Sequence, residues 1–238
     1  ENLNLINSLS ENEAYARVGY YYEIGKGREN AEKAASFYKK EYEAAMALRE
    51  KDTGPDGLIS SGLAKNNLAK SLLAAGGREN LRQGLKLSCE AFQEEEHLSY
   101  TLTDDFYRHE CAQYALEVFT EIFQTVWQLK ELCEEVPEKQ EYDILLAPYM
   151  AASIALADRL NREYHTEKAR LAVCNTYGFA SAYYYAGKNN DKALFYGKKR
   201  ADGMEAMGRD YGTESYQGEF RSILEAFKRS DKPAGKYP

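Results

Sequence analysis

The tetrapeptide Gly-Arg-Glu-Asn occurs twice, at Gly27–Asn30 and at Gly77–Asn80, and the residues around it repeat at the same offset of fifty positions. The further matched pairs are Val18/Leu68, Gly19/Ala69, Tyr22/Leu72, Gly25/Ala75, Ala34/Gly84 and Phe37/Leu87. Gapless self-similarity at a fixed period is typical of repeat folds, in which each copy buries its apolar face against the next. The repeat therefore predicts the architecture before any other feature of the chain.

Composition points to helices. The chain has 238 residues, of which 44% are hydrophobic, so it is long enough to bury a substantial core. Only 5 residues are proline, and good helix formers are frequent while runs of Val, Ile and Thr are not. The net charge of −7 disfavours nucleic acid as a direct partner. No apolar run reaches the roughly 18 residues of a membrane span.

Each copy reads as two antiparallel helices joined by a glycine turn. The first copy covers about 11–51, opens with a capping box at Ser10–Glu13, and has a second helix over about 30–50. The second copy covers about 57–99, with helices at about 58–75 and 80–98. A third copy covers about 167–209, its second helix running over about 192–208, and an amphipathic capping helix is expected at about 212–229.

The middle block, about 103–165, departs from the repeat and predicts a pair of long helices. The first runs from about 103 to 136 and ends at Pro137, and the second covers about 139–164. Pro148 should kink the second helix or split off its first turns. The whole chain is therefore expected to be one all-α domain of about nine helices, a right-handed stack of antiparallel helical hairpins.

The first copy resembles the Sel-one-like branch of the tetratricopeptide repeats. The resemblance rests on the pattern Val18-Gly19-x-x-Tyr22-x-x-Gly25-x-Gly27 followed by Lys33-Ala34-x-x-Phe37-Tyr38-x-Lys40. The first copy has one residue fewer than that family between its second glycine and the Lys-Ala pair. The third copy, with Gly178, Ala180, Ala182, Tyr183 and Gly187, is similar to an ordinary tetratricopeptide repeat. The middle block does not match.

The resemblance implies a concave groove that binds peptides or protein segments through the first helix of each repeat. Its positions in this sequence would be Arg17, Tyr20, Glu23, Asn66, Asn67, Lys70, Tyr177, Ser181 and Tyr184. Asn67 and Lys70 resemble part of the polar set with which some family members hold a carboxylate terminus. The full set is not present in this chain.

Tyrosine is abundant, with 20 residues, and two triplets occupy equivalent places in two first helices: Tyr20–Tyr22 and Tyr183–Tyr185. Three consecutive residues spread over much of a helix circumference, so at least one tyrosine of each triplet should be exposed. Exposed tyrosine offers rigid contact area with a polar tip, which suits recognition. Core packing is the competing interpretation for any one of them.

Other residue patterns suggest chemistry but have simpler interpretations. Asp104, Asp105 and Glu110 could bind a metal, yet the two aspartates suit a helix N-terminus. Glu94-x-x-His97 has the spacing of a di-iron ligand pair but lacks the second pair, and Glu94–Glu96 reads as a solvated charge run. The acidic residues around Pro137 are expected to form a solvent-exposed corner, or alternatively a surface that binds a basic partner: Glu131, Glu134, Glu135, Glu138, Glu141 and Asp143.

The four cysteines fall in helical patterns without close pairs, and buried free thiols suit a reducing cytoplasm: Cys89, Cys111, Cys133 and Cys174. The chain does not begin with Met, so it reads either as a processed protein, with a removed signal peptide, or as part of a longer one.

The function expected from these features is non-enzymatic: a scaffold that binds a protein or peptide in its groove, without metal or cofactor. Two alternatives remain open. One is a ligand- or peptide-sensing domain of a larger, bacterial regulator, and the other is an all-α metal-dependent enzyme that uses Asp104, Asp105 and Glu110.

Overall fold

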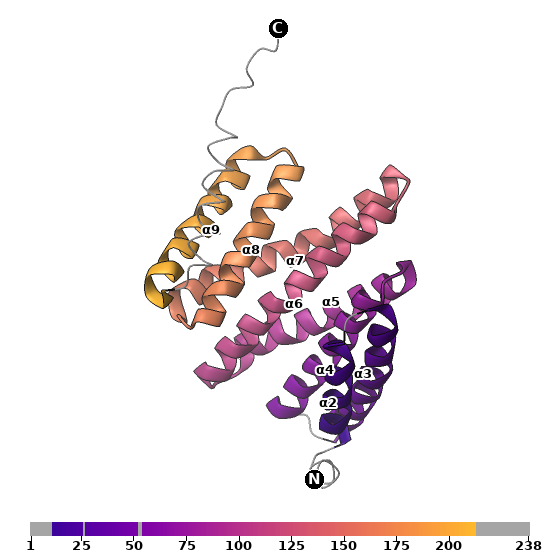
Figure 1. Cartoon of the computed structure of the whole chain (residues 1–238). Coiled ribbons are helices and arrows are strands. Elements are labelled where there is room, and N and C mark those ends of the chain that lie inside the picture. Colours follow the sequence, from indigo (N-terminus) through magenta and orange to yellow (C-terminus); the bar gives the residue numbers. More distant parts are fainter. Residues whose placement is uncertain (1–10, 26, 52–53, 213–238) are drawn as a thin grey trace. The chain divides into compact units, whose positions relative to one another are not determined.

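The computed structural model describes residues 11–25, 27–51 and 54–212. Within these ranges the ordered elements are eight helices and no strand (Figure 1). Their bounds are α2 Glu11–Glu23, α3 Arg28–Arg49, α4 Pro55–Ala75, α5 Arg78–Thr101, α6 Asp105–Leu132, α7 Val136–Glu163, α8 Glu167–Ala186 and α9 Asn190–Tyr211. The all-α prediction is confirmed. The expected capping helix at about 212–229 and Ser10 of the capping box lie outside the described residues.

The chain divides into two compact units, Glu1–Tyr149 and Met150–Pro238, with the boundary inside α7. Each unit has its own packed helices and is described by itself below. That the two units form a single domain stays a prediction.

The repeated tetrapeptide joins the turn to the second helix of the first two hairpins: its glycine ends the turn, and its other three residues begin α3 and α5. Gly27 and Gly77 are the N-cap residues of α3 and α5, with φ of 112° and 85°. L-residues with a side chain rarely adopt such angles, which explains why glycine occupies both positions. Asn80 Nδ2 donates to the Gly76 carbonyl at 2.9 Å, so the last residue of the tetrapeptide ties the second helix back to the turn.

Successive helices of the first unit pack against one another in chain order from α2 to α6, with α2, α3 and α4 lying as close neighbours in Figure 1. In addition, α2 contacts α4, and α4 contacts α6. The first helices of successive hairpins therefore form a layer of their own, as the repeat predicts.

Small residues allow the two helices of each hairpin to approach closely. A Cβ atom on Gly19 of α2 would lie 2.6 Å from a ring carbon of Tyr38 on α3. In the second copy the glycine is on the other helix, because a Cβ on Gly84 of α5 would lie 3.2 Å from the Ala69 carbonyl oxygen of α4. Gly19 and Ala69 are equivalent positions of the repeat. Both copies thus keep the close approach but place the glycine on opposite helices.

The middle block forms two long helices, α6 and α7, each of 28 residues. Asp104 caps α6 by accepting a hydrogen bond from the Tyr107 backbone N–H, which confirms its interpretation as a helix cap. Pro137 lies in the first turn of α7, and Pro148 lies inside that helix, which is continuous from Val136 to Glu163. The helix is therefore not split at Pro148, and a kink there stays a prediction. Proline removes a single backbone hydrogen bond there, and Tyr149 is held by Phe92, with ring centroids 5.4 Å apart.

In the second unit α8 packs against α9 around buried Cys174, Met204 and Met207. All four cysteines are free; Cys111, Cys133 and Cys174 are buried and Cys89 is half-buried. Cys133 follows α6 as its C-cap residue rather than lying within the helix. None of the described helices has both the length and the apolar character needed to cross a bilayer.

Replacing Gly84 with valine should lower the free energy of unfolding by about 2 kcal/mol, because the added methyl groups would force α4 and α5 apart. Urea denaturation measures the change. Ala47→Val, at an exposed position of α3, is the matched control and should cost only about 0.5 kcal/mol of helix propensity. Equal losses in the two variants would contradict the role of Gly84.

Candidate functional site

A surface cavity of about 380 Å³ opens in the first unit, where the layer of first helices meets α3. Its lining comes from α2, α4 and α6, together with two residues of α3. The lining residues are Asn12, Glu13, Ala16, Glu41, Leu48, Ile59, Ser60, Leu63 and Tyr107. Asn12 Nδ2 donates to Ser60 Oγ at 3.2 Å and so ties α2 to α4 within the lining.

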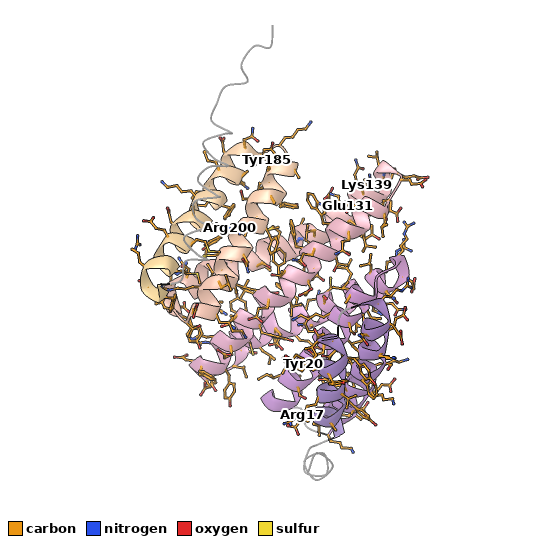
Figure 2. All side chains as sticks on the ribbon, viewed as in Figure 1. Arg17, Tyr20, Glu131, Lys139, Tyr185 and Arg200 are labelled. Carbon is orange, nitrogen blue, oxygen red and sulfur yellow. The ribbon has the colours of Figure 1, made fainter. Side chains whose placement is uncertain are left out.

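None of the nine groove positions implied by the resemblance is among the lining residues, although the lining residues of α2 and α4 lie on the same faces of these helices. On α2, Glu13 and Ala16 line it, and Arg17, Tyr20 and Glu23 continue that face at three- and four-residue steps. Arg17 and Tyr20 project from α2 (Figure 2), and Tyr20 is 61% exposed. The Glu23 carboxylate accepts a hydrogen bond from the Tyr38 hydroxyl, so one of its oxygens is engaged inside the hairpin.

On α4, Leu63 lines the cavity, and the predicted residues Asn66, Asn67 and Lys70 follow it on the same face. Asn66 is only 1% exposed, which removes it from contact with any outside molecule. Asn67 Nδ2 lies 3.1 and 3.3 Å from the two carboxylate oxygens of Glu41. The Asn67 amide is therefore already paired with a carboxylate of this chain.

Lys70 also interacts electrostatically with a carboxylate of the chain, that of Glu121. Burial raises the pKa of Glu121 on α6, the positive charge of Lys70 lowers it, and the negative charge of Glu23 on α2 raises it. These three side chains from α2, α4 and α6 are thus within electrostatic reach of one another. The polar set that resembles a carboxylate holder faces carboxylates that the fold itself supplies.

Glu41 is the most unusual group of the cavity. It is 6% exposed, and burial raises its pKa from 4.5 to about 7, while the hydrogen bond from Asn67 opposes the rise. Its helix carries the buried stripe Ala34, Tyr38, Glu41 and Ala45. An acidic residue at an otherwise apolar position of a buried helix face is the feature of the sequence from which Glu41 could have been predicted.

Leu48, Leu63 and Tyr107 also line the cavity and were not predicted from the sequence. They are 43%, 41% and 46% exposed. Tyr107 comes from the middle block, which does not match the repeat, so the register could not select it. Leu48 comes from a second helix, whereas the resemblance implied first helices only.

The predicted positions of the second unit are engaged within that unit. Tyr177 is 3% exposed and donates its hydroxyl to Asp158 at 2.7 Å. Ser181 donates to the Ala193 carbonyl at 2.7 Å, and Tyr184 stacks on Tyr196 with ring centroids 5.6 Å apart. Of its tyrosine triplet, Tyr185 at the end of α8 is 70% exposed (Figure 2). Each triplet therefore has an exposed member, as predicted.

Lys199 supplies the positive charge beside that stack. Its Nζ lies 2.7 Å from an Asp158 oxygen and 4.9 Å from the centre of the Tyr177 ring. The cation, the carboxylate and the rings satisfy one another. These contacts engage the cluster within the second unit.

The acidic residues identified in the sequence have mixed outcomes. Glu95 is 1% exposed, and Glu94 pairs with Arg49 at 2.7 Å and Lys65 at 2.6 Å, so the interpretation of Glu94–Glu96 as a solvated run is wrong. A helix packed on both sides leaves little of its surface to solvent, and Gly62 of α4 leaves room for the Glu95 carboxyl.

The acidic corner around Pro137, which carries Glu131 and Lys139 (Figure 2), is partly engaged, since Glu138 pairs with Arg78 and Arg82. Its docking of a basic partner stays a prediction. Among the side chains that the structure describes, no three His, Cys, Asp or Glu residues are grouped so that they could hold a metal ion.

No family model and no curated protein matches this chain. Among solved structures it is similar to a computationally designed self-assembling cyclic homooligomer, at 13% identity and a TM-score of 0.46, over 95% of this chain and 86% of that chain. It is also similar to a de novo designed helical repeat protein, at 16% identity and a TM-score of 0.42, over 92% of both chains. These values do not assign the chain to a family.

Glu41→Gln should change how stability depends on pH. Because the folded state raises the pKa of Glu41 from 4.5 to about 7, its contribution is fully present below about pH 4.5 and is lost as the pH rises through 7. The free energy of unfolding of the variant, relative to the natural chain, should rise by roughly 1–3 kcal/mol between pH 5 and pH 8. Urea denaturation at several pH values measures it.

Glu43→Gln, at an exposed position of α3, is the matched control for this experiment, and its difference from the natural chain should not vary with pH. Parallel pH profiles for Glu41→Gln and the natural chain would refute the assignment to Glu41.

Proposed function

We propose that the protein is a non-enzymatic, tetratricopeptide-like module that binds a protein or peptide segment on the layer formed by α2, α4 and α6. The observation that carries this proposal is the cavity of about 380 Å³, which opens on that layer and is bordered by the exposed apolar side chains Leu48, Leu63 and Tyr107. Exposed apolar groups around a concave site are typical of surfaces that bind other molecules.

The contact set proposed here differs from the one expected from the resemblance. Arg17 and Tyr20 stay in it, because both are exposed on α2 beside the cavity. Asn67 and Lys70 interact instead with carboxylates of the chain: Asn67 donates a hydrogen bond to Glu41, and Lys70 interacts electrostatically with Glu121. The cytoplasm is the proposed location, in keeping with four free thiols.

A second candidate function is a ligand-sensing domain of a larger regulator. The same cavity favours it, since about 380 Å³ lies within the range of small-molecule sites, roughly 300–1,000 Å³. The two candidates differ in what they retain: a sensor should keep a small molecule through native purification, whereas a peptide-binding module should keep a protein.

The test of the proposed function is capture of a partner by the tagged chain from cells that contain it. Leu63→Glu with Tyr107→Glu should lower recovery of the specific partner at least about tenfold, because two added charges disrupt an apolar contact of the interface. Both positions are more than a third exposed, so the fold should persist, and circular dichroism checks this.

Leu132→Glu is the matched control, because Leu132 is 50% exposed at the far end of α6. This variant should capture the partner as the natural chain does. Equal recovery by the cavity variant and the natural chain would show that partners bind elsewhere.

A further inference from the structure

The charge of the cavity lining is one-sided. Two carboxylates line it, Glu13 from α2 and Glu41 from α3, and none of the described lining residues is Lys, Arg or His. Glu41 accepts from the amide of Asn67 at 3.1 and 3.3 Å. A carboxylate has about four acceptor positions, so this neutral donor leaves Glu41 with capacity for further donors.

The remainder of the lining suits an aliphatic stem and a planar group. Ile59 and Leu63 of α4 and Leu48 of α3 are apolar. Tyr107 of α6, a residue that is 46% exposed, adds an aromatic ring. Arginine combines an apolar stem with a planar cation that stacks on aromatic rings and binds carboxylates with two parallel hydrogen bonds. A volume of about 380 Å³ lies near the lower end for ligand pockets, which suits a side chain rather than a whole peptide.

The cation Arg17 lies beside the cavity on α2, but the two polar groups of α4 next to the cavity are already engaged with carboxylates of the chain. Asn67 and Lys70, which would hold a carboxylate terminus in the related repeats, act here on Glu41 and Glu121. A second carboxylate brought by a ligand would meet Glu13 at the cavity wall and, above about pH 7 where Glu41 is ionised, Glu41 as well, and like charges repel. The chain as a whole carries a net charge of −7, which also attracts a basic partner.

We propose that the cavity between α2, α3, α4 and α6 receives an arginine side chain from a basic segment of a partner protein, with the guanidinium at Glu41 and the stem against Leu63 and Tyr107. This assignment rests on the proposed function and names the chemistry of its partner. Glu13 supplies a second carboxylate on the α2 side of the same cavity.

The probe is a capped, fluorescent peptide with two arginines separated by one leucine, compared with the same peptide in which citrulline replaces both arginines. Citrulline keeps the shape of arginine and removes its charge. The natural chain should bind the arginine peptide at least about tenfold more tightly than the citrulline peptide. Fluorescence anisotropy measures both dissociation constants.

Glu41→Gln should weaken binding of the arginine peptide at least about tenfold and leave the citrulline peptide unaffected. Glu43→Gln removes the same charge from an exposed position of α3 and should leave both peptides unaffected. Equal binding of the two peptides, equal effects of the two variants, or no binding of the arginine peptide up to about 1 mM would each overturn the assignment.

Two further outcomes separate this assignment from the proposed function. Capture of a partner that Leu63→Glu with Tyr107→Glu abolishes but Glu41→Gln leaves intact would keep the binding surface and reject the arginine site. Self-association of the natural chain that Glu41→Gln abolishes, measured by analytical ultracentrifugation, would reject a separate partner in favour of a second copy of this chain.

Discussion

The left-handed glycine that precedes the second helix of each early hairpin is the constraint on which the first unit depends. Gly27 and Gly77 adopt φ angles of 112° and 85°, which reverse the chain within a few residues. Short reversals oblige the two helices to pack on each other over their whole length. The close contacts at Gly19 and Gly84, and the alignment of α2, α4 and α6 in one layer, are consequences of that reversal.

The first unit buries two carboxyl groups on its second helices, α3 and α5. Glu41 and Glu95 are 6% and 1% exposed, and burial raises the pKa of each carboxyl to about 7. Burying an ionisable group costs stability unless a partner compensates. Asn67 compensates only part of this cost at Glu41, and an incoming guanidinium would compensate more. A binding site that is unfavourable for the free protein is consistent with the proposed function.

Much of the fold could be predicted because it follows from local patterns. The offset between the two tetrapeptides determines the hairpins, and Asp104 begins α6 as its cap, as expected. The helix does not split at Pro148, because the packing of its neighbour Tyr149 on Phe92 offsets the loss of one backbone hydrogen bond, and local patterns do not show such packing. Glu94 and Glu95 were misjudged for the same reason, since charge alone does not show which face of a helix is covered.

The helices, their turns and the face of each first helix on which a site could form follow from local sequence patterns, because glycine angles, caps and apolar periodicity act over a few residues. Which side chains of that face are available depends on the tertiary structure. It places Glu41 of α3 and Tyr107 of α6 at one cavity, pairs Asn67 with Glu41, and buries Asn66 and Tyr177. These outcomes depend on contacts between residues distant in the chain, and burial and pairing are properties of such contacts.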